Sequence, residues 1–488
     1  MPSSRSIIVW SMIWRLLEKS SIQVVSFIVT VVLARLLLPE QYGIIALITI
    51  FIALANVIVD GGLNMALIQK QDVNDTDYST VFISSLTLSL VLYAILYFIA
   101  PIIADFYRTE ELVPVIRVLS LSLLFYVLNS IQSAYVARKM LFRKMFICNL
   151  LAVTLSGICG IYLAIKDFGV WALVAQNLSN ICFSSLLLWM VVRWRPSLSF
   201  SIKSFTGLFS FGWKIFVSNF IITLFIKIRA LIIGRMYLPA TLAYYDKGNQ
   251  FPSVLSDTVC GAIQSVLFPA FSEIQDDRIR VKRMMRRSIN VTCLFMFPLM
   301  AGLIAIAKPL VVVLLTEKWL PCVPFLQIIC LSYLFRPITI ANGQAITAMG
   351  YSSITLKLEI IRKTVDVIVL IISCHIGVLA IAWGVVIVNF TCLFINLVPN
   401  IRLLNYNISE QLNDVLPTLV AAVAMCASIY WISYVNISPY LQLPIQLFAG
   451  IIVYWIFCKT LKLEAYRYLV SLAKEKLPSS WNRILRFL

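Results

Sequence analysis

The stretch Leu33-Ala34-Arg35-Leu36-Leu37-Leu38-Pro39, followed by Tyr42-Gly43, ends the first long apolar segment of the chain. A second stretch, Ile233-Gly234-Arg235-Met236-Tyr237-Leu238-Pro239, ends another apolar segment, and Arg235 follows Arg35 by 200 residues. The two segments also begin alike, with Trp14-Arg15 in the first and Trp213-Lys214 in the second. This repeated motif, carried by Arg35, Pro39, Gly43, Arg235 and Pro239, predicts a chain built from two similar halves.

Composition indicates an integral membrane protein. Of the 488 residues, 61% are hydrophobic and 13% are charged, and the mean hydropathy is +0.92. Soluble globular proteins carry roughly 25% charged residues. The first apolar segment is too long for a signal peptide and has no small-residue cleavage site, so we expect it to remain as a span.

The apolar segments predict an all-α polytopic fold. A membrane-spanning helix needs about 20 mostly apolar residues, and the chain contains about fourteen such segments. Their expected limits are 12–34, 42–65, 79–103, 113–133, 146–166, 169–192, 209–234, 242–269, 289–315, 322–346, 354–374, 377–400, 415–435 and 441–460. The loops between them are too short for a separate catalytic domain.

The repeat predicts how the spans are grouped. Spans one and seven are six positions apart in the order of spans and so run in the same direction, which makes the halves parallel repeats. We expect six-helix bundles at 1–205 and 206–405 around a central cavity. Two additional transmembrane helices follow at 406–460, and a basic cytoplasmic tail follows at 461–488. Similar halves in a polytopic membrane protein are typical of transporters that rock around a central site.

The formal net charge of +18 is explained by topology rather than by nucleic-acid binding. Lysine and arginine concentrate in cytoplasmic loops of membrane proteins. Here they gather in alternate loops, above all in 278–287, and in the segment after 459, which places both termini in the cytoplasm. Within the tail, Leu463, Tyr466, Leu469, Val470 and Leu472 alternate with basic residues, which suits either attachment to a lipid surface or a solvated tail.

Metal and cofactor chemistry has no support in the sequence. The eleven cysteines are scattered, and neither a CxxC pair nor a Cys/His spacing occurs. The one histidine, His375, lies in a turn between two spans and is expected at the membrane interface. We therefore expect no metal site and no cofactor.

The pattern Ala-Arg-x-Leu-x-Pro-x-x-Tyr-Gly at 34–43 resembles the signature of the polysaccharide (Wzx-type) flippases. These belong to the multidrug/oligosaccharidyl-lipid/polysaccharide exporter superfamily. Segments 62–70, 266–277, 317–319 and 324–327 resemble the colanic-acid-exporter branch in particular.

The resemblance implies a non-enzymatic protein of the bacterial inner membrane. Such a protein moves undecaprenyl-pyrophosphate-linked oligosaccharide repeat units from the cytoplasmic to the periplasmic leaflet, for surface polysaccharide biosynthesis. Its expected partners are the lipid-linked oligosaccharide, membrane lipids, and a polysaccharide polymerase with its export machinery. Two alternatives stay open, a multidrug or other small-solute exporter of the same superfamily and a membrane-embedded polysaccharide polymerase or ligase.

Cations inside the spans are the candidate binding residues. A charge at a helix centre costs about 2.5–3.5 kcal/mol on insertion, so several of them indicate a water-filled cavity or mutual pairing. Arginine and lysine bind phosphate by charge-assisted hydrogen bonds. We predict substrate binding by some of Arg15, Lys19, Lys227, Arg229 and Arg336. Snorkelling to an interface, or pairing with an acid on a neighbouring helix, would explain the same residues without binding.

Acids inside the spans are candidates for coupling or pairing, and they are Asp60, Asp257, Glu359 and Asp366. Asp257 lies near mid-membrane, where it would partner a basic residue or carry a coupling proton. Glu359, Arg362, Lys363 and Asp366 share one helical face, which suits internal ion pairing or a polar cavity wall. The residues leave the coupling ion open between a proton and sodium, and no Walker motif is present.

Overall fold

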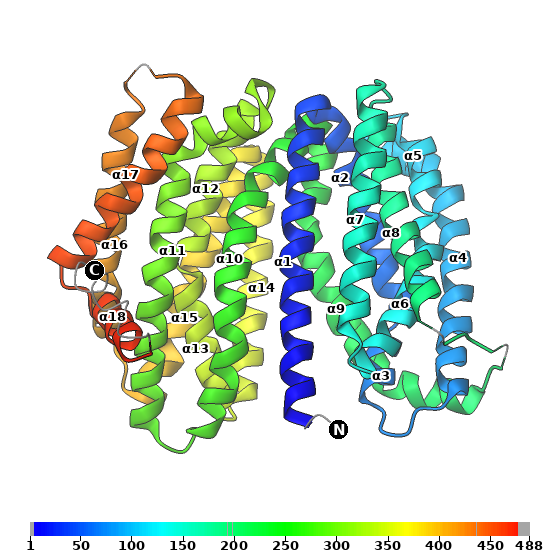
Figure 1. Cartoon of the computed structure of the whole chain (residues 1–488), viewed down its shortest axis with the longest axis horizontal. Helices are drawn as coiled ribbons and strands as arrows, with labels where there is room; N and C mark the ends of the chain where they lie inside the picture. Colours follow the sequence, from blue (N-terminus) through cyan, green and yellow to red (C-terminus); the bar gives the residue numbers. More distant parts are fainter. Residues whose placement is uncertain (1–3, 193, 198, 436, 477–488) are drawn as a thin grey trace. The chain divides into compact units, whose positions relative to one another are not determined.

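The structure is a computed structural model that describes residues 4–192, 194–197, 199–435 and 437–476. These residues form helices joined by short connections, and no strand occurs among them (Figure 1). Contacts within the chain divide it into two units, Met1–Ala243 and Tyr244–Leu488. The prediction of an all-α polytopic fold is therefore confirmed.

The first unit contains nine helices of the described chain and the first turn of a tenth. They are α1 (Ser4–Leu36), α2 (Pro39–Asp60), α3 (Leu63–Gln69), α4 (Asp75–Tyr107), α5 (Leu112–Leu119), α6 (Ser122–Arg138), α7 (Phe142–Ile165), α8 (Val170–Val191) and α9 (Ile202–Met236).

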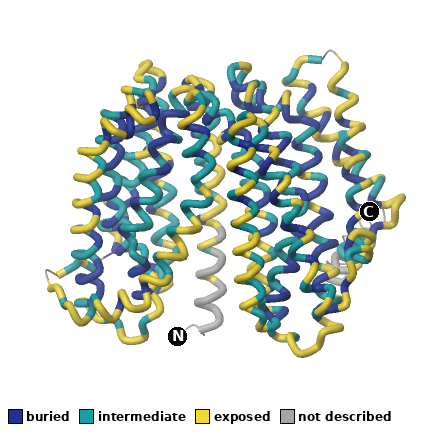
Figure 2. Tube along the Cα trace, turned by 180° about the vertical axis from the view of Figure 1, so that it is seen from behind, coloured by how far each residue is buried: buried dark blue, intermediate teal, exposed yellow. Residues whose placement is uncertain are grey.

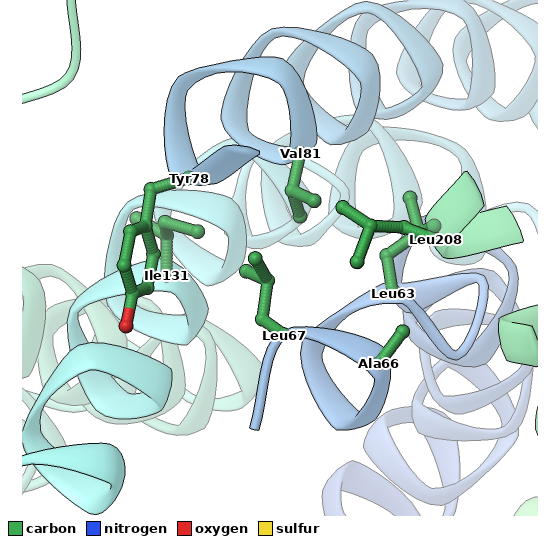
Figure 3. Packing of buried hydrophobic residues seen from close by; sticks show 7 residues of the cluster. All are labelled: Leu63, Ala66, Leu67, Tyr78, Val81, Ile131 and Leu208. Carbon is green, nitrogen blue, oxygen red and sulfur yellow. The ribbon is translucent and has the colours of Figure 1, made fainter. Parts of the chain in front are cut away.

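Packing within the first unit follows two groups of helices. In one group, α1 packs on α7, and both α6 and α7 pack on α8. In the other group, α9 packs on α2, α3 and α4. Figure 3 shows the buried cluster that joins the second group to α6, formed by Leu63, Ala66, Leu67, Tyr78, Val81, Ile131 and Leu208.

The second unit is organised around one long helix, α11 (Arg278–Leu315), which packs on α12, α13, α15, α16, α17 and α18. The other elements are α10 (Pro239–Glu273), the 3-10 helix η1 (Glu317–Cys322), α12 (Val323–Leu334), α13 (Arg336–Ala348), α14 (Ser352–Ile376), α15 (Val378–Leu404), α16 (Ile408–Ile432), α17 (Pro439–Thr460) and α18 (Glu464–Lys476).

Thirteen helical segments of the described chain are long and apolar enough to cross a membrane. Large apolar side chains such as Phe98, Met190 and Ile226 are 65–75% exposed, and exposed positions recur along the helices in Figure 2. Such outward apolar faces suit contact with lipid tails. The expected eleventh span, α14, is helical but carries five charged residues and is not among the thirteen. The count of fourteen spans and the parallel repeat stay predictions.

Two expected spans are each built from two shorter helices. The fourth is divided into α5 and α6 at Ser120 and Leu121. The tenth is divided into α12 and α13 at Phe335, next to Pro337. Proline lacks the backbone donor that would continue the helix and clashes with the preceding turn, so Pro337 accounts for this break.

The second span ends at a glycine pair. Gly61 and Gly62 have φ values of 53° and 72°, a left-handed conformation that side chains with a Cβ rarely adopt. The chain turns there from α2 into the short helix α3. Arg138 donates to the carbonyl oxygens of Leu67, Lys70 and Gln71 and so caps the end of α3.

The two copies of the sequence motif meet within the first unit. A Cβ added to Gly43 would lie 1.9 Å from the carbonyl oxygen of Pro239, and one added to Gly234 would lie 2.1 Å from the side chain of Leu47. Farther along, a Cβ on Gly62 would lie 2.1 Å from the carbonyl oxygen of Gly212. Small residues thus let α2 and α9 approach closely. The expected boundary between the bundles at 205/206 was drawn from the sequence repeat, and it stays a prediction. The division by contacts is a different one, and it groups α9 with the first unit.

The described part of the basic tail is not simply solvated. Leu463 and Ala465, 4% and 5% exposed, pack with Leu294, Ala421 and Cys458. The guanidinium of Arg287 lies 4.1 Å from the centroid of the Tyr468 ring. The helix α18 therefore covers part of α11, and residues 477–488 of the expected tail lie outside the described residues.

The first of the two additional helices, α16, is attached to α11 by polar contacts. Arg286 on α11 forms an ion pair with Asp414 on α16 at 2.5 Å, and the phenol of Tyr406 donates to Asp414 at 2.7 Å. Burial and this hydrogen bond raise the pKa of Tyr406, so the phenol stays protonated and keeps donating. Lys282 pairs with Glu410 at 2.8 Å. The start of α16 is thus fixed to α11.

Candidate functional site

Arg15 on α1 is held by a buried acid of the same helix. Its Nη1 donates to Glu18 Oε2 at 2.7 Å, and Glu18 is 4% exposed. Asn149 on α7 donates to the other carboxylate oxygen at 2.9 Å. The Arg15 side chain is itself 55% exposed, so its guanidinium keeps donors available for an anion.

The contact at Glu18 continues as a hydrogen-bonded chain through three more helices. Ser184 on α8 donates to Asn149 Oδ1 at 2.7 Å and accepts from Asn129 on α6 at 2.7 Å. Ser133 donates to Asn129 Oδ1 at 3.2 Å. These polar residues were not among the predicted site residues. The sequence does indicate such residues, because an asparagine within an apolar span needs a hydrogen-bond partner when it is buried.

The remaining predicted cations of the first unit lie on α1 and α9. Lys19 is exposed beside Glu18, and Lys227 and Arg229 are half-buried on α9. Lys227 lies nine residues before the end of α9 at Met236, about 14 Å along the axis. It makes no hydrogen bond or ion pair within the described residues. Whether these three bind substrate stays a prediction.

Arg336 is the first residue of α13 and contacts α10. Its Nη1 donates to Asp257 Oδ1 at 2.7 Å and to Ser256 Oγ at 2.9 Å. Its guanidinium lies 5.4 Å from the centroid of the Tyr333 ring. The side chains of Arg336 and Asp257 are 37% and 61% exposed. The structure thus pairs Arg336 with an acid on a neighbouring helix and leaves the pair open on one side.

Asp60 lies at the last position of α2 and is half-buried. The Asn64 amide donates to its carboxylate and also to Ser130 Oγ on α6, the latter at 2.6 Å. These contacts join the end of α2 to α3 and α6, and the partners of Asp60 among the described residues are neutral.

On the charged face of α14, the guanidinium of Arg362 pairs with the carboxylate of Glu359 at 3.6 Å. Both side chains are exposed, at 40% and 54%, whereas Asp366 is 8% exposed. The predicted pairing along this face is present for Glu359. A role for either acid in coupling stays a prediction.

The motif residues do not gather around the cations. Arg35 and Arg235 are exposed at the ends of α1 and α9, and the Arg235 guanidinium lies 4.8 Å from the centroid of the Phe106 ring. Pro39 begins α2, where its fixed φ suits the first helical turn. The geometry assigns Gly43 and Pro239 to packing.

Two cations that the predicted binding set omits are held by aromatic rings. Lys247 on α10 is 7% exposed, donates to Gln250 Oε1 at 3.1 Å, and lies 5.9 Å from the centroid of the buried Trp319 ring. Arg117 lies 4.4 Å from the centroid of the Tyr97 ring. A cation within an apolar span is the signal that marks Lys247, as it marks Arg336. No group of three or more His, Cys, Asp or Glu side chains that could bind a metal occurs within the described chain.

Solved structures share this fold. The inward closed conformation of the lipid II flippase MurJ aligns with a TM-score of 0.74 at 18% identity, covering 94% of this chain and 100% of that one. An inward-facing multidrug resistance MATE family transporter of the MOP superfamily aligns with a TM-score of 0.60 at 16% identity, covering 80% of this chain and 98% of that one.

Relatives in sequence carry names from polysaccharide biosynthesis. The chain is 27% identical to the succinoglycan biosynthesis transport protein ExoT of Rhizobium meliloti (strain 1021), over 65% of each chain. It is 28% identical to the teichuronic acid biosynthesis protein TuaB of Bacillus subtilis (strain 168), over 61% of this chain and 62% of that one. It is 24% identical to the lipopolysaccharide biosynthesis protein WzxC of Escherichia coli (strain K12), over 73% of each.

The alignments with ExoT and TuaB thus span just under two thirds of those relatives' lengths. A family model described as "Polysaccharide biosynthesis protein" matches residues 32–324, more than half of the chain. The membrane-length apolar helices and these matches identify a multi-pass membrane protein. The chain belongs to the polysaccharide biosynthesis protein family.

Proposed function

We propose that the protein translocates undecaprenyl-pyrophosphate-linked oligosaccharide repeat units from the cytoplasmic to the periplasmic leaflet of a bacterial inner membrane. The observation that carries this proposal is the family match over residues 32–324. It is supported by the relatives named for succinoglycan transport and lipopolysaccharide biosynthesis, and by a fold shared with a lipid II flippase.

The chemistry of the cations suits such a substrate. A pyrophosphate and a glycan cannot cross hydrocarbon unaided, because their polar groups would lose their hydration. Arginine binds phosphate oxygens through a rigid fork of donors. Asp257 lies near the middle of the 35-residue helix α10, and an exposed ion pair at that depth would face water rather than lipid. Arg336 would therefore line a hydrated route for the head group.

Transport would proceed by alternating access, with the cationic residues presented to each side of the membrane in turn. The residues proposed to contact the head group are Arg15, Lys19, Lys227, Arg229 and Arg336. Export that is unimpaired after charge-removing substitutions at Arg15, Lys227, Arg229 and Arg336 together would contradict this role. A polymerase that consumes the exported repeat unit is the proposed partner.

A multidrug or small-solute exporter is the second candidate, since the MATE transporter shares the fold. Cationic drugs would favour a cavity lined by several uncompensated acids, whereas three acids within the helices, Glu18, Asp257 and Glu359 with Asp60 left aside, each have an arginine partner. A polymerase or ligase is the third candidate, and it would need catalytic residues in a large outward loop, which the short connections do not provide.

The deciding experiment uses a strain that lacks this gene. Lipid-linked oligosaccharides are extracted and one surface polysaccharide is assayed alongside. We expect complete repeat units to accumulate on undecaprenyl pyrophosphate while the surface polymer is lost. Exported but unpolymerised repeat units would instead favour an enzyme, and no change in either pool would favour a small-solute exporter.

A further inference from the structure

Several acids in the membrane-length helices are compensated by a cation. Four such ion pairs are Arg15–Glu18 at 2.7 Å, Lys70–Asp77 at 2.7 Å, Arg336–Asp257 at 2.7 Å and Arg286–Asp414 at 2.5 Å. Asp60 differs from the acids of these four pairs. It is half-buried, and no lysine or arginine side chain that the structure describes pairs with it. An uncompensated carboxylate away from water is costly, so its charge requires another explanation.

The donors that reach Asp60 are neutral. One is the Asn64 amide and the other is the backbone N–H of Gly62. The Asn64 amide nitrogen donates its second hydrogen to Ser130 Oγ at 2.6 Å. These contacts orient the carboxylate without neutralising it.

Two amide oxygens beside Asp60 lack partners. Asn64 Oδ1 is buried and accepts no hydrogen bond within the described residues, and the same is true of Asn56 Oδ1. Asn56 precedes Asp60 by one helical turn and therefore shares its face of α2. Buried acceptors without donors are rare in folded proteins and call for an unseen partner.

The backbone adds to the negative potential at this point. Asp60 is the last residue of α2, where carbonyl groups give a helix end a partial negative charge. Gly61 and Gly62, at φ 53° and 72°, interrupt the helix immediately afterwards. Interrupted helix ends of this kind coordinate small cations in transporters. A carboxylate at the C-terminal end of a helix is disfavoured unless a positive charge joins it.

We propose that Asp60, Asn56, Asn64 and Ser130 form a binding site for a monovalent cation such as sodium. The offered ligands are one carboxylate and neutral oxygens, which suit a hard cation of single charge. Histidine and cysteine ligands, which transition metals prefer, do not gather there in the described chain. Binding at this site does not depend on the proposed function, although a translocation cycle would offer it a coupling role.

The test measures thermal unfolding of the purified full-length protein in detergent, in sodium chloride or choline chloride of equal ionic strength. Sodium at about one hundred times its Kd is expected to raise Tm by about 3 °C relative to choline, because a ligand that binds only the folded state stabilises it. The Asp60→Asn variant is expected to lose this rise.

A milder pair of variants guards against misfolding. Ser130→Ala removes one proposed ligand and is expected to raise the sodium concentration at half-effect several-fold. Ser133→Ala is the matched control, because this serine lies one turn farther along α6 and bonds to Asn129 instead. It is expected to respond like the parent protein.

Three outcomes would overturn the site. They are no sodium-dependent rise in the parent protein, an equal rise in Asp60→Asn, and a rise that follows pH but not sodium, which would mean that Asp60 is held protonated. Failure of the proposed function is separate from these, because it is read from lipid-linked oligosaccharides in the deletion strain.

Discussion

One arginine in each unit pairs with an acid while part of its side chain stays exposed. Arg15 is bonded to Glu18 and Arg336 to Asp257, yet their side chains remain 55% and 37% exposed. The pair of Arg336 and Asp257 is exposed on both sides, and such a pair contributes only about 0–1 kcal/mol. A phosphate that offers more acceptors can therefore displace Asp257 at little cost, whereas buried Glu18 would be left uncompensated. Asp257 would then act as an internal counter-ion that the substrate phosphate replaces.

This competition predicts opposite effects for the two members of the second pair. Asp257→Asn frees Arg336 and is expected to lower the apparent KM for translocation. Arg336→Gln removes a charged donor and is expected to reduce kcat/KM by more than tenfold, since hydrogen bonds to charged groups contribute about 1.5–3 kcal/mol. Flipping of lipid-linked oligosaccharide in proteoliposomes is the measurement. Asp276→Asn, at an exposed loop acid, is the control, and a raised KM in Asp257→Asn would contradict the competition.

The close contact at Gly43 leaves no room for a larger side chain. A Cβ at Gly43 would lie 1.9 Å from the Pro239 carbonyl, so the helices must move apart to admit it. Gly43→Ala is expected to lower the free energy of unfolding by about 1–3 kcal/mol, measured as a lower Tm in detergent. Gly207→Ala is the control, because nothing lies within 4 Å of its added Cβ. Equal Tm values for the two variants would refute the close approach.

At the scale of elements, α18 shows how the tail is attached. The cluster beneath it contains Leu463, 4% exposed, and Leu294, 5% exposed. Leu463→Ala is expected to lower the free energy of unfolding by about 2–5 kcal/mol, because it leaves a cavity. Leu461→Ala, at a side chain that is 42% exposed, serves as its control and should change little. Chemical denaturation compares them, and similar losses would mean that α18 is not packed.

Elements and contacts differed in how well the sequence predicted them. Apolar length alone located the helices, and Pro337 marked the break between α12 and α13. The break between α5 and α6 carries neither proline nor glycine, so no local signal predicted it. The chain from Glu18 to Asn129 joins four helices, and its partners are brought together only by packing. The sequence therefore identified which charged residues lie inside the helices. It did not identify their partners, because these are brought close only by the tertiary structure.

At the scale of the whole molecule, the basic residues define a topology. Residues 278–287 carry six lysines or arginines, and Lys459 and Lys462 precede α18. From this distribution the positive-inside rule predicts that both termini lie in the cytoplasm. Green fluorescent protein fused after residue 488 should fluoresce, whereas alkaline phosphatase at the same point should be inactive. A fusion after Asp167, expected outside, is the control with the opposite pattern, and an active phosphatase at residue 488 would refute this orientation.

The charges on α14 also bear on how the protein is made. Lys357, Glu359, Arg362, Lys363 and Asp366 together would make solitary entry of this helix into the bilayer unfavourable, at about 2.5–3.5 kcal/mol for each central charge. Its neighbour α15 is strongly apolar and packs on it. We expect the translocon to release α14 only as a hairpin with α15, so glycosylation mapping should find α14 uninserted on its own and inserted when α15 follows.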